Sequence, residues 1–166
     1  MTHPRTHLDL RRAKTKGREA VLTTLISNDA YIAQVAAGFI DATLPKAEWT
    51  HAAHFAALLW ILRHRPELHP EKDMPGLIRA YNTATGTENS DTSGYHETIT
   101  LASIAVTRAV MAGNDSDQPL HAILHQIMAS SLGQSNWLLA HWRRHTLFSV
   151  EARRHWVAPD LASLDA

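Results

Sequence analysis

The chain has 166 residues, a formal net charge of zero and no cysteine. This length suits one domain whose core is large enough to fold without metals or disulfides, and the lack of cysteine excludes disulfides, thiolate metal sites and a cysteine nucleophile. No apolar run reaches the roughly 18 residues of a membrane span, and the first residues lack the apolar core of a secretory signal. We therefore expect a cytoplasmic protein with no membrane partner.

The first predicted segment is basic. Residues 1–19 hold six Lys and Arg against Asp9 and Glu19. A basic arm can contact nucleic acid or a membrane surface, but a solvated leader is the simpler interpretation. We predict a flexible arm over residues 1–18, a single helical domain over 19–166, and no nucleic-acid partner.

The rest of the chain is typical of an all-α protein. Apolar residues recur with helical spacing and no segment alternates with period two, which predicts an irregular bundle of about six helices. The expected N-caps are Asn28 with its neighbours, Thr50, Ser149, and either Thr92 or Ser93. The helical patterns cover residues 16–26, 29–42, 50–64, 74–82, 94–112, 119–131, 135–146 and 150–156.

A long polar stretch, NTATGTENSDTS, covers residues 82–93. It is too polar for a strand and long for a connector, and long loops in compact domains are often functional. We expect this loop to cover a substrate, with Asn82, Asn89 and Asp91 directed toward it.

Two histidines lie on the inner side of the predicted helix 50–64. With about 100° between successive residues, His51 and His54 fall in the same arc as Phe55, Leu58 and Leu62. Residues three apart share a helix face, so the two rings can converge. An unpartnered polar group in a core costs a few kcal/mol. The pair is therefore either two neutral core histidines bonded to backbone carbonyls or part of a metal or catalytic site.

A second group of chemically capable residues follows the polar loop in SGYHETIT. His96 and Glu97 fall in the first turn of a helix that is apolar nearly all round, a natural wall for a site. Stabilisation of a carboxylate by the helix dipole explains Glu97 alone, but it gives no reason for His96.

Together these residues predict a metal site. Three imidazoles and one carboxylate suit a single divalent metal with an open coordination position. We expect His51, His54 and His96 to be the ligands and to lie within about 5 Å of a common point, given metal–nitrogen bonds of about 2 Å. Glu97 is then a fourth ligand or the general base for a metal-bound water. The metal is Zn, Fe, Cu or Ni.

The remaining candidates are weaker. His121 and His125 have a ligand-like spacing, but they lie at or beyond the edge of their apolar stripe. Either Arg153 or Arg154 can clamp a carboxylate or phosphate, although pairing with a nearby acid of the chain is the simpler role. Trp49 stands beside the histidine pair.

Three blocks resemble a family of small, uncharacterised bacterial proteins: LPKAEWTHAAHFAALLWIL, RAYNTATGTENSDTSGYHETIT and LFSVEARRHWVAPDLASL. The resemblance covers roughly residues 30–164, and its most specific parts are W-T-H-x-x-H and G-Y-H-E-T. It implies a single-domain helical protein and no particular reaction. The positions that it marks are Trp49, His51, His54, Tyr95, His96 and Glu97.

Three functions remain open at this point. The first is a small metal-dependent enzyme acting on a small molecule, either by activating water or by oxidation, with Trp49, Asn82, Asp91 and Tyr95 contacting the substrate. The second is a metal- or ligand-binding or sensing module without chemistry. The third is a helical interaction protein whose histidines and glutamate form a buried hydrogen-bond network.

Overall fold

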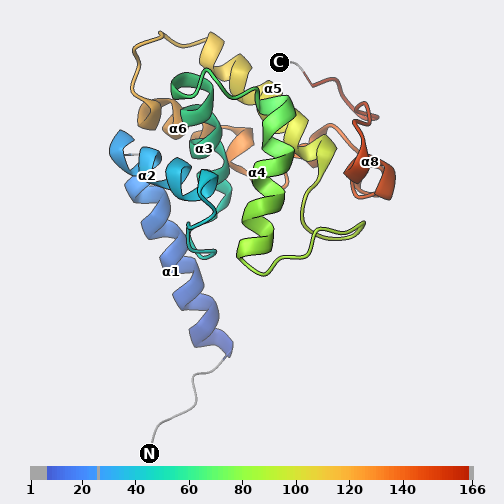
Figure 1. Ribbon diagram of the computed structural model, residues 1–166, viewed down its shortest axis with the longest axis horizontal. Coiled ribbons are helices and arrows are strands. Elements are labelled where there is room, and N and C mark those ends of the chain that lie inside the picture. Colours follow the sequence, from blue (N-terminus) through green and yellow to red (C-terminus); the bar gives the residue numbers. More distant parts are fainter. Residues whose placement is uncertain (1–6, 26, 165–166) are drawn as a thin grey trace, which may run out of the picture.

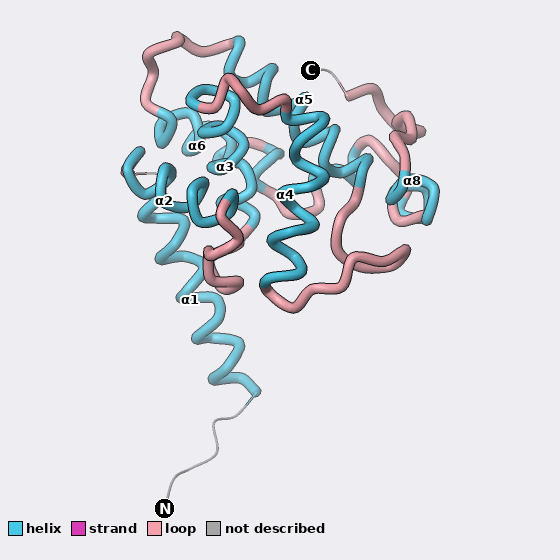
Figure 2. The backbone as a smooth tube through the Cα atoms, in the orientation of Figure 1, coloured by secondary structure: helices cyan, strands magenta, loops and turns pink. Residues whose placement is uncertain are grey.

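The structure is a computed structural model that describes residues 7–25 and 27–164. Within these ranges it contains helices and no strand, which confirms the predicted all-α bundle (Figures 1 and 2). No helix in the described ranges is long and apolar enough to cross a membrane. The elements are α1 (His7–Leu25), α2 (Asp29–Ile40), α3 (His51–His64), α4 (Pro70–Ala84), α5 (Glu97–Ala112), α6 (Leu120–Ala129), η1 (Ser131–Gly133), η2 (Trp137–Ala140), α7 (Arg144–Leu147) and α8 (Val150–Arg154).

Helix α3 is the centre of the bundle and packs against α1, α2, α5 and α6. The predicted N-cap is confirmed, because Thr50 Oγ1 accepts a hydrogen bond from the Ala53 amide at 3.2 Å. Its alanines let neighbouring helices approach closely, and Phe55, Leu59 and Ile61 fill the core between them. The helix ends at His64, two residues before Pro66, because the helical conformation is disfavoured for the residue that precedes a proline. This central position buries Ala52, Ala53 and Phe55 of its first turns, whereas His51 is partly buried and His54 is exposed to solvent.

Helix α1 starts at His7, earlier than the predicted residue 16, so most of the expected basic arm is helical. Residues 11–20 are exposed, and only its last turns meet α2 and α3. Figure 1 shows the N-terminal half projecting from the body of the molecule. Residues 1–6 lie outside the described residues, and the flexibility of the arm stays a prediction.

Other boundaries also differ from the prediction. Helix α4 begins at Pro70, which suits the first helical position, and the Asp73 carboxylate accepts from the His69 amide at 2.6 Å. The predicted helix 135–146 is wrong, because the chain forms η2 and the short α7 instead. Trp142 is fully buried and donates from Nε1 to the Val157 carbonyl at 3.0 Å. The Arg143 amide donates to Asp160 Oδ1 at 2.8 Å, so tertiary bonds replace helical ones here.

Candidate functional site

Two cavities adjoin the inner face of α3. The larger has a volume of about 480 Å³ and lies between α3, α5, η2 and the start of α7. The smaller, of about 200 Å³, lies between α3, α4 and α5. They share four lining residues and are therefore adjacent: His54, Leu58, Ile99 and Ser103. We call them the large and the small cavity.

The His54 ring borders both cavities. No hydrogen bond from its ring nitrogens to any described residue is present, and solvent reaches the ring. Desolvation of the ring by the surrounding residues and, second, the nearby His51 lower the pKa of His54 to about 4, although the side chain is exposed to solvent. Contact with solvent opposes that lowering, but a pKa below the usual value still leaves the imidazole neutral at pH 7. A neutral imidazole offers a ligand one donor and one acceptor nitrogen.

Aromatic rings hold His54 in position. Trp49 lies against the imidazole with ring centroids 4.2 Å apart, and Phe39 of α2 stacks on the other side of the indole at 4.5 Å and 5°. The segment that carries Trp49 is fixed by the Tyr31 hydroxyl, which donates to Glu48 Oε2 at 2.9 Å. The imidazole is thus supported by the core on one side and faces the cavities on the other.

His51 occupies the rim of the large cavity and is partly buried. Its Nε2–H donates to the Leu132 carbonyl at 2.7 Å, and its ring meets Phe55 edge-on at 5.3 Å. In this tautomer Nδ1 is an acceptor, and it has no hydrogen-bond partner within the described ranges. The two predicted ligands therefore differ. The His51 ring is hydrogen-bonded to the backbone through one nitrogen, whereas the His54 ring has no hydrogen bond to a described residue.

His96 is a structural residue. It is 6% exposed and forms the N-cap of α5, where its Nδ1 accepts from the Ile99 amide at 3.4 Å. Its Nε2–H donates to the Leu147 carbonyl at 2.9 Å. Burial lowers the pKa of His96, with the Arg153 charge acting in the same direction and the bond to Leu147 opposing it. Both ring nitrogens are engaged, so none is available to a metal without breaking a bond.

The expected cap at Thr92 or Ser93 is wrong. Gly94 adopts a φ of +73°, and the chain continues extended through His96, so the helix starts three residues later than predicted. A Cβ at Gly94 would lie 2.5 Å from the Glu88 carbonyl oxygen. The glycine is therefore required for the turn that delivers His96 to the cap.

Glu97 faces Tyr95 and is absent from the lining of both cavities as described. The Tyr95 hydroxyl donates to Glu97 Oε2 at 2.6 Å, while the Arg79 guanidinium covers the Tyr95 ring at 4.2 Å from its centroid. Burial and the neighbouring carboxylate raise the pKa of Tyr95. Tyr95 lines the small cavity together with Trp49, and contact of these two residues with a substrate stays a prediction.

The expected metal-binding arrangement is not found. Among the described residues, no group of three or more His, Asp or Glu is arranged to hold a metal ion. The bonds of His96 to the backbone give the reason, since they direct its ring toward Leu147 and Ile99. Metal binding by this chain stays a prediction, with His51 Nδ1 and the His54 ring as the nitrogens that remain free of protein partners in the described part of the site.

The polar loop has internal partners. Asn82 is buried within α4, and its amide donates to Asn89 Oδ1 at 2.9 Å. The same oxygen accepts from the Tyr95 amide at 3.2 Å, and Asn89 Nδ2 donates to the Arg79 carbonyl at 3.1 Å. Asn82 and Asn89 thus bond the loop to α4 and to Tyr95, and contact of the loop with a substrate stays a prediction.

Asp91 also has a partner from the chain itself. Its two carboxylate oxygens accept from Arg154 Nε and Nη2 at 2.8 and 2.7 Å, a bidentate pair at the surface. Arg153 donates to the Gly94 and Tyr95 carbonyls at 3.2 and 2.9 Å. Arg154 therefore pairs with an acid of the chain, which is the simpler role expected for it, whereas Arg153 bonds to backbone carbonyls instead. Asp91 lines neither the large nor the small cavity as described.

The weaker histidine pair is divided as well. His121 Nδ1 lies 2.6 Å from Asp29 Oδ1, and the Leu120 and His121 amides donate to the two Asp29 oxygens at 3.0 and 2.7 Å. Asp29, the first residue of α2, thereby also satisfies the start of α6. No comparable contact is shown for His125.

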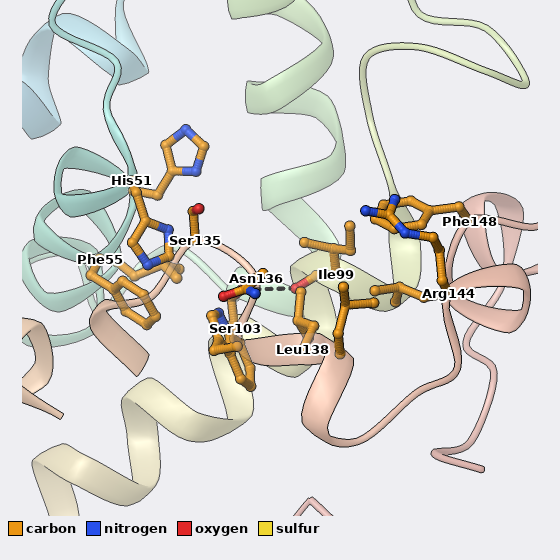
Figure 3. Close-up of a pocket in the computed structure, with 14 residues that line it drawn as sticks. His51, Phe55, Ile99, Ser103, Ser135, Asn136, Leu138, Arg144 and Phe148 are labelled. Carbon is orange, nitrogen blue, oxygen red and sulfur yellow. Dashed lines mark hydrogen bonds between the residues drawn. The ribbon is translucent and has the colours of Figure 1, made fainter. Parts of the chain in front are cut away.

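Sequence reasoning missed the far wall of the large cavity. Figure 3 shows His51 and Phe55 on one side and Arg144 and Phe148 on the other, with Ile99 between them. The residues that were missed are Asn136, Leu138, Arg144, Leu147 and Phe148. They belong to short turns without periodicity, so only their placement in space identifies them.

Comparison with known proteins adds no identity: no family model, no curated protein and no solved structure matches the chain. The resemblance to an uncharacterised family stays a prediction that rests on the quoted motifs.

Proposed function

We propose that this chain is a helical module that binds a small, largely apolar molecule in the large and small cavities. The observation that carries the proposal is His54, whose ring borders both cavities and has no hydrogen-bond partner among the described residues. The His54 side chain is exposed to solvent, and no buried side-chain nitrogen or oxygen of the described residues lacks a partner, so its ring nitrogens are accessible from the cavities. A ligand donor or acceptor in the cavity would give this imidazole the partner that the protein does not supply.

The shape and lining of the site support the same function. A volume of about 480 Å³ lies within the usual range for small-molecule sites, which are mostly apolar with a few polar groups. Phe55, Leu58, Ile99 and Leu138 provide the apolar surface, and the stacked Trp49 keeps the imidazole in place. A ligand would therefore meet a site that is largely formed before binding.

Binding of uncharged probes tests the proposal. The affinities of 4-methylphenol, indole and octanamide are measured by calorimetry on wild type, His54→Leu and His64→Leu. His64 is a matched control, because it lies on the same helix, also contacts a tryptophan and is remote from both cavities. We expect at least one probe to bind wild type and His64→Leu equally and to lose about tenfold in His54→Leu, the effect of one hydrogen bond. Binding that is absent from wild type, or unchanged in His54→Leu, would contradict the proposal.

Metal-dependent chemistry, the first function expected from the sequence, needs a separate test. A three-histidine site would require His96 to give up its bonds to Leu147 and Ile99. Metals that bind only the native state raise its melting temperature, and more so as pH rises through the imidazole range. If zinc raises the melting temperature of chelator-treated wild type but not that of His54→Leu, metal binding is favoured over the ligand-binding module proposed here.

A further inference from the structure

The large cavity is electrically one-sided. Arg144 is the only side chain with a permanent charge in its described lining, and neither Asp nor Glu lines the large or the small cavity in the part of the chain that the structure describes. His54, which lines both cavities, adds no second charge at pH 7, since desolvation and the nearby His51 lower its pKa. A cleft with one sign of charge and apolar walls concentrates counter-ions of the opposite sign.

Arg144 is also free to take a ligand. Its guanidinium lies 5.3 Å from the Phe148 ring centroid, and it forms no ion pair with any described residue. The neighbouring Arg143 differs, because it is held by Asp160 through its backbone amide and its side chain. A guanidinium presents paired N–H groups that match a carboxylate.

We infer that the ligand of this site is an amphipathic monocarboxylate, a deepening that rests on the proposed function. The carboxylate pairs with Arg144 at the mouth, and the apolar body lies over Ile99, Leu138 and Leu147. Its far end reaches toward His51 of α3, which Figure 3 shows across the cavity from Arg144. Because Arg144 supplies a single positive charge in the described lining, beside neutral donors such as Ser135 and Asn136, the site suits a singly charged carboxylate better than a doubly charged phosphate.

A matched set of probes tests the ligand class. Octanoate, octanamide and octyl phosphate share one chain and differ in the head group. Their affinities are measured by calorimetry at constant ionic strength on wild type, Arg144→Gln and Arg143→Gln. We expect octanoate to bind wild type at least tenfold more tightly than octanamide and more tightly than octyl phosphate. Arg144→Gln should remove the preference for octanoate and leave the affinity for octanamide unchanged. Arg143→Gln should retain both the preference for octanoate and the affinity for octanamide.

The outcomes separate the two proposals. Equal binding of octanoate and octanamide, or a preference that survives in Arg144→Gln, overturns the carboxylate inference. If octanamide affinity still depends on His54 in either of these cases, the proposed function stands. Tighter binding of octyl phosphate also overturns the inference and points to a phosphate ligand. If none of the three probes binds wild type, the inference fails, and the uncharged aromatic probes then decide the proposed function.

Discussion

His54 and His96 illustrate how the same residue type takes opposite roles in one small fold. The sequence predicts one role for both, as ligands of a shared metal. In the structure His96 is buried with both nitrogens bonded to the backbone, whereas His54 has no protein partner among the described residues and faces two cavities. An inward position is therefore insufficient evidence for function. What distinguishes the two is whether the chain itself satisfies the ring.

The largest expected effect concerns His96. His96→Leu should lower the free energy of unfolding by about 2–4 kcal/mol, of which the lost N-cap accounts for about 1 and the Leu147 carbonyl left without a donor for about 1–3. Urea unfolding followed by circular dichroism measures the change. His96→Asn keeps a capping acceptor but loses the reach to Leu147, so its loss should be smaller. If His96→Leu and wild type have the same free energy of unfolding, His96 is not a structural residue.

The turn before His96 gives a second effect, with its own matched control. Gly94 and Gly86 have φ values of +73° and +71°, but only Gly94 lacks room for a Cβ. Gly86→Ala should cost about 1–2 kcal/mol for the left-handed backbone alone. Gly94→Ala should cost more, because the loop carbonyl of Glu88 must also move. Equal losses in the same unfolding assay would show that the close approach is not needed.

His54→Leu should change stability far less than His96→Leu. No hydrogen bond to the described protein is lost and the side-chain volume is similar, so we expect a change within about 1 kcal/mol. Its effect should appear in ligand binding instead. His64→Leu serves as the reference for a surface histidine on the same helix. A loss of several kcal/mol in His54→Leu would place His54 in a buried network like that of His96.

The smallest effect is the pH dependence of stability. The native pKa of His54, about 4, lies below its usual value of 6.5. The unfolded state therefore takes up a proton first as pH falls, so this contribution to stability is complete above about pH 6.5 and is lost toward pH 4. Melting temperatures measured from pH 7.5 to 4 should fall more steeply in wild type than in His54→Leu, which retains the contribution of His96. Parallel curves would contradict a lowered pKa at His54.

Local signals in the sequence predicted the local features. Asn28, Thr50 and Ser149 cap α2, α3 and α8 as expected, because short polar side chains satisfy free amides wherever a helix starts. Helical spacing placed His54 on the side of α3 that borders the cavities, but its side chain is exposed to solvent and not buried in the core. The cap by His96 was missed, because it depends on the backbone of Gly94 and on a carbonyl contributed by Leu147, 51 residues away.

The far wall of the cavity was beyond prediction for a related reason. Arg144 and Phe148 lie in a segment where tertiary bonds of Trp142 and Arg143 replace helical ones. Such a segment has no period from which an inner face can be recognised. Partners far apart in the sequence, more than residue type, decide which polar groups remain available to a ligand.

The central claim, that His54 is open to a ligand while His96 is closed, is tested most directly by NMR of the histidine side chains. Long-range proton–nitrogen spectra of protein labelled with nitrogen-15 in histidine are recorded at pH 7 during addition of octanamide, with His54 assigned from His54→Leu. We predict a neutral His54 ring whose nitrogen signals shift during the titration, and a His96 ring that keeps its Nε2–H tautomer throughout. A His54 signal that stays fixed while the His96 signals shift would contradict the account.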